Sequence, residues 1–131
     1  MAWLRRQELR RLLATPHGTH HLVLNDHDLS GLQLRGADLD HALLRGADMA
    51  HCDLSRARLT GAQLQRANLR GANLTDADLS GANLRGADLR EAYLRGANLT
   101  GTCLVGAKLD GAILSDAILD DARGVDTDVI A

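Results

Sequence analysis

Hydrophobic positions recur every five residues over 22–121, without a single insertion. Leu occupies the centre of nineteen of the twenty units, from Leu24 to Leu119, and Met49 occupies the remaining one. Ala stands two residues before the centre in fifteen units, and Gly stands two residues after it in eleven. Asp or Asn commonly precedes the Leu, so the unit is Ala-(Asp/Asn)-Leu-x-Gly.

This spacing excludes an α-helix and predicts a coil of short straight segments. Five residues advance a helix by about 140° net, which would scatter the leucines around its whole circumference. In an extended segment, the small residue and the Leu share one face and the intervening Asp or Asn points outward. Gly then supplies the positive φ of a corner. A unit this short cannot bury its own Leu, so successive turns must stack.

The runs Gly71-Ala-Asn-Leu-Thr, Gly86-Ala-Asp-Leu-Arg and Gly96-Ala-Asn-Leu-Thr resemble the unit of the pentapeptide-repeat family. The resemblance covers about three quarters of the chain. It implies an all-β solenoid, a right-handed quadrilateral β-helix with four units per turn and about five coils. At ~4.8 Å per coil the rod would be roughly 24 Å long.

The chain divides into three parts: an N-terminal capping helix and linker at 1–21, the repeat β-helix at 22–121, and a C-terminal cap or tail at 122–131. Apolar spacing predicts an α-helix over 2–14, with Leu9, Leu12 and Leu13 on one side. We expect this helix to cover the open end of the coil. Its four arginines leave a membrane-surface or nucleic-acid element as the alternative.

Two cysteines and the absence of long apolar runs bear on the compartment. Cys52 replaces an inward Ala and Cys103 an outward Asp or Asn, so the two are not expected to pair. Neither a membrane span nor a secretory signal is recognisable. We expect a cytoplasmic protein, with an exported effector as the alternative.

Four histidines near the start raise the question of a metal site. They are spread along irregular sequence without a nearby cysteine, and adjacent side chains of an extended chain point apart, so no metal or cofactor is predicted. The four are His17, His20, His21 and His27. Because His27 takes an inward position, the first turn is expected to be distorted or half closed.

Charge is distributed unequally when outward residues are sorted with a period of twenty. Each side is named here by its first central Leu. The Leu24 side carries net +2, the Leu29 side −2, the Leu34 side 0 and the Leu39 side −4. The Leu39 side provides a candidate acidic face made of Asp38, Asp40, Asp78, Asp120 and Asp121.

Apolar residues replace outward polar ones in the last turns. They form a candidate C-terminal apolar contact of Tyr93, Ile113, Ile118, Val125, Val129 and Ile130. Such residues fit either a tail that folds back as a cap or an isologous homodimer contact. Members of the resembled family often dimerise through this end, which favours a homodimer as strongly as a cap.

These features predict a non-catalytic scaffold for protein–protein interaction. Flat sides and a Leu-filled interior offer no concave, water-excluding pocket, so no enzyme is expected. The alternative implied by the family is a DNA mimic that binds or protects a type II topoisomerase, DNA gyrase. Duplex DNA would carry about −14 over ~24 Å, whereas the four sides sum to −4. Neither direct nucleic-acid binding nor membrane binding is expected, and the protein partner is not specified.

Overall fold

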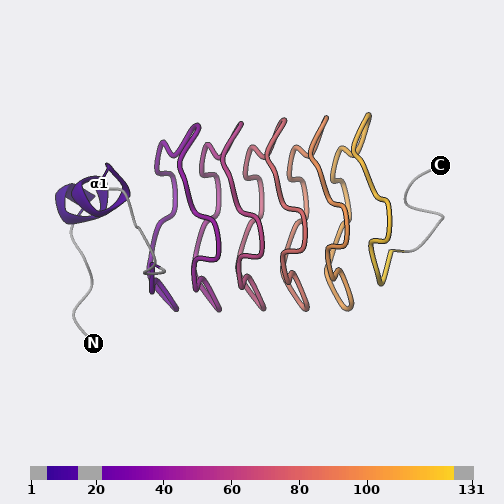
Figure 1. Ribbon diagram of the computed structural model, residues 1–131, viewed down its shortest axis with the longest axis horizontal. Coiled ribbons are helices and arrows are strands. Elements are labelled where there is room, and N and C mark those ends of the chain that lie inside the picture. The colour runs from indigo at the N-terminus through magenta and orange to yellow at the C-terminus, as the bar shows by residue number, and fades with distance from the viewer. Residues whose placement is uncertain (1–5, 15–21, 126–131) are drawn as a thin grey trace.

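The computed structural model describes residues 6–14 and 22–125, which form one helix and a stacked coil (Figure 1). Isolated parallel bridges join each outward residue to the one twenty positions later, from Val23 with Leu43 to Cys103 with Arg123. One coil therefore consists of four units, as the resemblance implied. Each side contributes a single bridging residue, because only about three residues are extended between successive corners. The described part of the coil thus contains bridges rather than longer strands.

Every corner is closed by the same backbone hydrogen bond. The carbonyl of the central residue accepts from the amide three residues on, as Leu64 O does from Ala67 N at 3.0 Å. The last residue of all twenty units has positive φ, which matches the third position of a type II turn. Eleven of these residues are Gly, and the others are Asp26, His41, His51, Arg56, Arg66, Asp76, Glu91, Asp116 and Asp121.

Adjacent coils are joined by three backbone hydrogen bonds per unit. Leu44 N donates to Gln63 O at 2.8 Å, Gly46 N donates to Gln65 O at 2.9 Å, and Gln63 N donates back to Ala42 O at 2.9 Å. Because this ladder repeats on all four sides, each coil is held in register with the next.

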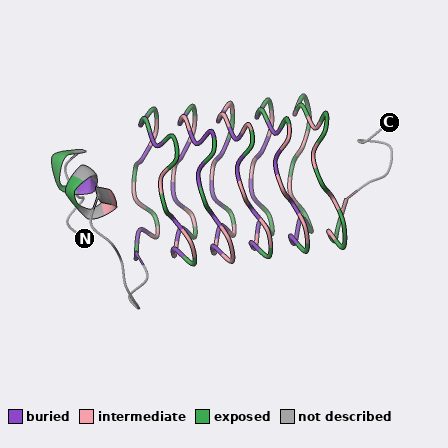
Figure 2. Ribbon diagram, turned by 45° about the horizontal axis from the view of Figure 1, so that its top comes forward, coloured by how far each residue is buried: buried purple, intermediate pink, exposed green. Residues whose placement is uncertain are grey.

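The interior is a continuous column of leucine and small residues. Figure 2 shows that buried residues recur along the successive coils. The central residues from Leu24 to Leu104 are at most 6% exposed. Polar groups enter this column only with a partner. The Cys52 thiol donates to Leu29 O at 2.8 Å, and the Thr102 hydroxyl donates to Leu79 O at 2.8 Å. Burial raises the pKa of the Cys52 thiol to about 11, so it remains protonated at neutral pH.

Helix α1 (Arg6–Ala14) lies at the N-terminal end of the coil (Figure 1). Leu9 is 2% exposed and belongs to the same hydrophobic cluster as the leucines of the coil, and Leu13 packs against that cluster. The helix predicted over 2–14 is confirmed from Arg6 onward, and 2–5 lies outside the described residues. Among the described segments, none forms a helix with the length and apolarity that crossing a membrane demands.

The first coil is regular, so the distortion expected at His27 is wrong. His27 N donates to Leu24 O at 3.2 Å, and the corner at Asp26 has the same positive φ as the others. The His27 ring is only partly buried, and its Nδ1 lies 3.0 Å from Asn25 O. The ring therefore reaches toward the corner rather than fully occupying the core.

The last coil is less covered than the others. Leu109, Leu114 and Leu119 point inward but are only partly buried. Beyond them, the backbone at Gly124 lies directly against Leu104 and Val105, where a Cβ would come within 2.6 Å of Val105 Cα. Cys103, expected on the outside, is 7% exposed in this region. Its outward position is therefore covered.

Candidate interaction surfaces

Every Asp or Asn that directly precedes a central Leu caps the following corner. Its Oδ1 accepts a hydrogen bond from the backbone N–H two residues on, an Asx turn. A following Ser or Thr also donates its hydroxyl to that oxygen, as Ser80 does to Asp78 at 2.6 Å. The ten capping residues are Asp28, Asp38, Asp48, Asp53, Asn68, Asn73, Asp78, Asn83, Asp88 and Asn98. Much of the outward acidity therefore has a structural role.

The candidate acidic face is interrupted and partly neutralised. Arg58 bridges to both Asp38 and Asp78 in the ladder, and its Nη2 lies 2.6 Å from Asp40 Oδ2. Asp40 also accepts from Thr60 N at 3.0 Å. The hydroxyl of Ser80 holds the pKa of Asp78 below its usual value. The remaining two members, Asp120 and Asp121, are exposed in the last coil.

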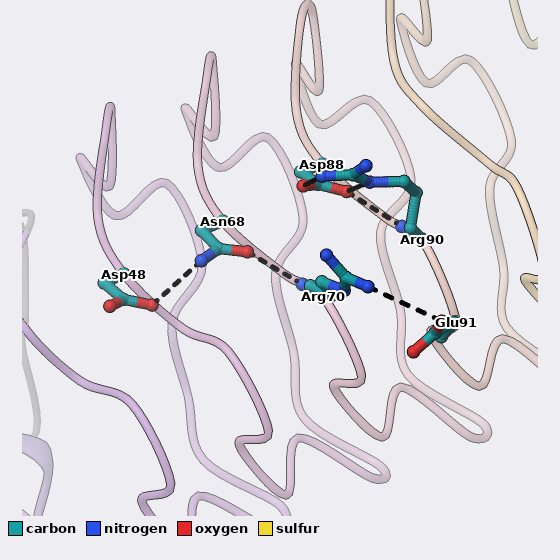
Figure 3. A network of polar contacts seen from close by, with 6 residues as sticks. All are labelled: Asp48, Asn68, Arg70, Asp88, Arg90 and Glu91. Atoms are coloured by element: carbon teal, nitrogen blue, oxygen red, sulfur yellow. Dashed lines mark hydrogen bonds and ion pairs between the residues drawn. The ribbon is translucent and has the colours of Figure 1, made fainter.

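Charges on the Leu29 side form a network (Figure 3). Asn68 Nδ2 donates to Asp48 Oδ1 at 3.3 Å, and Asn68 Oδ1 accepts from the backbone of Arg70. Arg70 Nη2 lies 3.6 Å from Glu91 Oε1.

The strongest polar contact on this side is bidentate. Arg90 Nε and Nη2 donate to the two carboxylate oxygens of Asp88 at 2.9 and 2.7 Å. This guanidinium lowers the pKa of Asp88 to about 2. The side chain of Asp88 is 23% exposed, so water screens the pair only in part.

Replacing Asp88 by Asn is expected to remove part of the acid sensitivity of folding. Asn keeps the corner cap but loses the carboxylate that pairs with Arg90. A lowered native pKa stabilises the fold above the ordinary pKa of 3.8, and that contribution disappears as pH falls toward about 2. Urea unfolding should show the variant about 1–2 kcal/mol less stable at pH 6 and nearly equal to wild type near pH 2.

Asp48→Asn provides the matched control for this experiment. Asp48 caps the same kind of corner but contacts Asn68 instead of an arginine. The control should show a smaller difference from wild type at pH 6. An Asp88→Asn deficit that persisted unchanged near pH 2 would contradict the assignment.

Three of the four described members of the candidate apolar contact are exposed. Tyr93 and Ile113 are bridged neighbours on the Leu34 side, 50% and 44% exposed, and Ile118 is 45% exposed on the next side. Val125 instead packs, half-buried, against the core. The other two members, Val129 and Ile130, lie outside the described residues.

The described residues contain no group of three His, Cys, Asp or Glu side chains that could hold a metal ion. Of the four histidines considered from the sequence, only His27 lies in the described part of the chain.

Comparison with known proteins agrees with this geometry. A family model described as pentapeptide repeats matches residues 28–64, 37–76, 52–91 and 77–116. Together these ranges span more than half of the chain. The chain belongs to the pentapeptide-repeat family.

Several solved structures are similar to this chain. A pentapeptide-repeat protein, Rfr23, from the cyanobacterium Cyanothece 51142 is 36% identical, with 79% of this chain and 70% of that chain covered and a TM-score of 0.59. HetL, involved in heterocyst differentiation regulation in Nostoc sp. strain PCC 7120, is 25% identical over 93% of this chain and 99% of its own, with a TM-score of 0.36. The plasmid-mediated fluoroquinolone resistance protein QnrB1 is 24% identical, with 79% of this chain and 62% of that chain covered and a TM-score of 0.40.

Membership of the pentapeptide-repeat family identifies the coil as a right-handed quadrilateral β-helix. No match was found among curated proteins.

Proposed function

We propose that this pentapeptide-repeat protein is a non-catalytic, cytoplasmic scaffold for protein–protein interaction. In this proposal its C-terminal end binds a second copy of the chain. The observation that carries the proposal is the difference in burial between the two ends of the coil. At the N-terminal end, Leu24 and Leu29 are at most 1% exposed, and Leu9 of α1 joins their cluster. At the other end, the inward Leu109, Leu114 and Leu119 remain partly exposed.

In this proposal α1 acts as the cap of the coil, which leaves the opposite end for a partner. The apolar side chains of Tyr93, Ile113 and Ile118 extend the exposed end onto the adjoining sides. Contiguous apolar surface at the rim and centre of one end is typical of a protein–protein contact.

The backbone of the last coil supports the same assignment. In earlier coils the amide of each central Leu donates to the next coil, but those of Leu109, Leu114 and Leu119 have no backbone acceptor among the described residues. The carbonyls of Ala107 and Ala112, which face the same way, likewise accept no backbone hydrogen bond from a described residue. An edge with both donors and acceptors can pair with a two-fold-related copy of itself.

Sedimentation equilibrium tests the proposal. The wild-type chain should have twice its monomer mass of 14.0 kDa at micromolar concentration. Ile113→Asp with Ile118→Asp should weaken association by about a hundredfold or more, because each buries a carboxylate in an apolar contact.

Val23→Asp is the matched control for the double variant. Val23 occupies the same outward position of its unit and is 61% exposed, but it lies in the first coil. It should leave the mass unchanged. The homodimer would be contradicted if the wild-type chain were monomeric at all concentrations. It would also be contradicted if Val23→Asp weakened association as much as the double variant does.

The alternative, a DNA mimic that binds DNA gyrase, depends on the acidic face. The ion pair between Asp40 and Arg58 reduces its charge, so we retain the scaffold. Salt-sensitive inhibition of gyrase supercoiling that is lost on replacing Asp38, Asp40 and Asp78 by Asn would favour the alternative. For Asp38 and Asp78, Asn preserves the corner caps, as Asn68 and Asn98 show, so that result would report charge rather than misfolding.

A further inference from the structure

Three exposed arginines gather on the Leu24 side without ion-pair partners. Arg45, Arg66 and Arg85 come from three successive coils, and none forms an ion pair with a described carboxylate. On the other sides, Arg58, Arg70, Arg90 and Arg95 do form such pairs, whereas Arg35 and Arg56 on the neutral Leu34 side form none with a described carboxylate. The Leu24 side is therefore the one on which unpaired guanidinium groups coincide with a net positive charge, +2 against 0 on the Leu34 side.

The three side chains line one shallow depression of about 480 Å³. Arg45 and Arg85 stand in one column with Gln65 between them, roughly 10 Å apart along the axis at ~4.8 Å per coil. Arg66 stands in the adjacent corner column, where the neighbouring coils carry Gly46 and Gly86. The Arg66 side chain extends over Gly86, while Asp26 extends over Gly46. Arg side chains are long enough to converge over Gln65.

The floor of the depression contains an unsatisfied polar atom. Gln65 Nε2 donates to Gln63 Oε1 at 2.7 Å, but Gln65 Oε1 is buried and accepts no hydrogen bond in the described structure. Buried acceptors without donors are uncommon in native proteins and often coincide with a bound water, ion or ligand. Because an amide oxygen only accepts, this atom calls for a donor such as a bound water, and it does not itself contact a phosphate dianion.

We infer that this depression binds the phosphoryl group of a phosphomonoester. Guanidinium groups match phosphate oxygens with paired N–H donors, and three of them suit a dianion better than a single carboxylate. The nearest acidic side chain in the same columns is Asp26, which lies against Gly46 at the N-terminal margin. The remainder of the site is cationic or neutral.

An extended nucleic-acid strand fits the surroundings less well. The arginine column ends in Asn25 on one side and Val105 on the other, so the positive charge does not continue along the rod. The neighbouring Leu29 side carries net −2 and would repel a longer polyanion. A compact phosphorylated group is therefore favoured over a polymer.

Isothermal titration at low ionic strength tests the inference with three probes: inorganic phosphate, a phosphoserine peptide compared with its unphosphorylated form, and a single-stranded oligonucleotide. Saturable binding of both phosphate probes is expected, with no binding of the unphosphorylated peptide. If the phosphopeptide binds about tenfold more tightly than inorganic phosphate, the phosphoryl group would come from a phosphorylated protein. Equal affinities would indicate a free phosphate compound.

Arg66→Gln and the double variant Arg45→Gln with Arg85→Gln should each weaken phosphate binding at least about tenfold. Arg35→Gln, on the neutral Leu34 side, is the control and should bind as wild type does. Thermal unfolding confirms that each variant remains folded, since all four arginines are exposed. Unsaturable binding, equal weakening by the control, or tighter binding of a single-stranded oligonucleotide than of the phosphopeptide would overturn the inference.

Discussion

Replacing Leu64 by Ala is expected to lower the free energy of unfolding by about 3–4 kcal/mol. Leu64 is fully buried in the middle of the coil, stacked between Leu44 and Leu84, which are equally buried. The flanking backbones are held by hydrogen bonds to the coils before and after, such as Leu64 N to Asn83 O at 2.8 Å. They cannot close over the lost side chain, so the cost includes a cavity as well as lost burial. Urea unfolding followed by circular dichroism measures the change.

Leu114→Ala is the matched control for that result. The same atoms are removed, but Leu114 is only partly buried in the last coil, and none of the described residues forms a coil beyond it. Its expected cost is about 1 kcal/mol. Both variants should be measured at the same low protein concentration, so that association does not contribute. Equal losses at the two positions would contradict the burial gradient along the coil.

Replacing Gly71 by Ala is expected to cost about 2–3 kcal/mol, for two separable reasons. Gly71 has φ +67°, where a Cβ is unfavourable for any residue. In addition, the new Cβ would lie 2.5 Å from Nδ1 of His51, whose ring projects over this corner from the preceding coil. Urea unfolding again measures the cost.

Gly81→Ala separates the two contributions. Gly81 has the same φ of +67°, but nothing lies within 4 Å of an added Cβ. It should cost about 1–2 kcal/mol, the backbone contribution alone. Combining His51→Ala with Gly71→Ala should bring the cost of the Gly71 substitution down to that of Gly81. If Gly71→Ala cost no more than Gly81→Ala, contact between stacked corners would not explain the choice of glycine.

That contact shows where sequence reasoning about glycine is incomplete. The corner position always has positive φ, yet Asp, His, Arg or Glu occupies it nine times in twenty. Positive φ alone therefore does not require Gly. A side chain at one corner instead extends over the next coil, as His41 does over Gly61 and Asp76 over Gly96. Such a corner side chain is usually followed one coil later by Gly. Arg56 is an exception, because the corner one coil later is Asp76.

The period of five was enough to predict the coil, because stacking identical layers demands one repeated inward side chain. The family resemblance added four units per turn, and the bridges between residues twenty apart confirm it. The capping role of the Asp or Asn that precedes ten of the twenty central residues was missed. The signal was available, since these residues are known to bond the backbone two positions on, but only the charge of the side chain had been considered.

The surfaces were predictable only in part. Sorting residues by side located Tyr93 and Ile113 together and separated the charges into faces. It could not show that Arg58 pairs with Asp40 across coils while Arg66 has no ion-pair partner among the described residues, because a long side chain can reach several neighbours. Nor could it show the burial of Cys103, which depends on how the chain beyond the last coil returns.

Hydrogen exchange of the last coil tests the central claim, that the C-terminal end is a binding surface for a second copy. The amides of Leu109, Leu114 and Leu119 have no backbone acceptor within the described residues, so in a monomer they should exchange rapidly. We predict that these amides become protected as the protein concentration is raised through the association range, and that Ile113→Asp with Ile118→Asp abolishes this protection. Exchange of the last coil that is independent of concentration, while the central coils stay protected, would contradict the account.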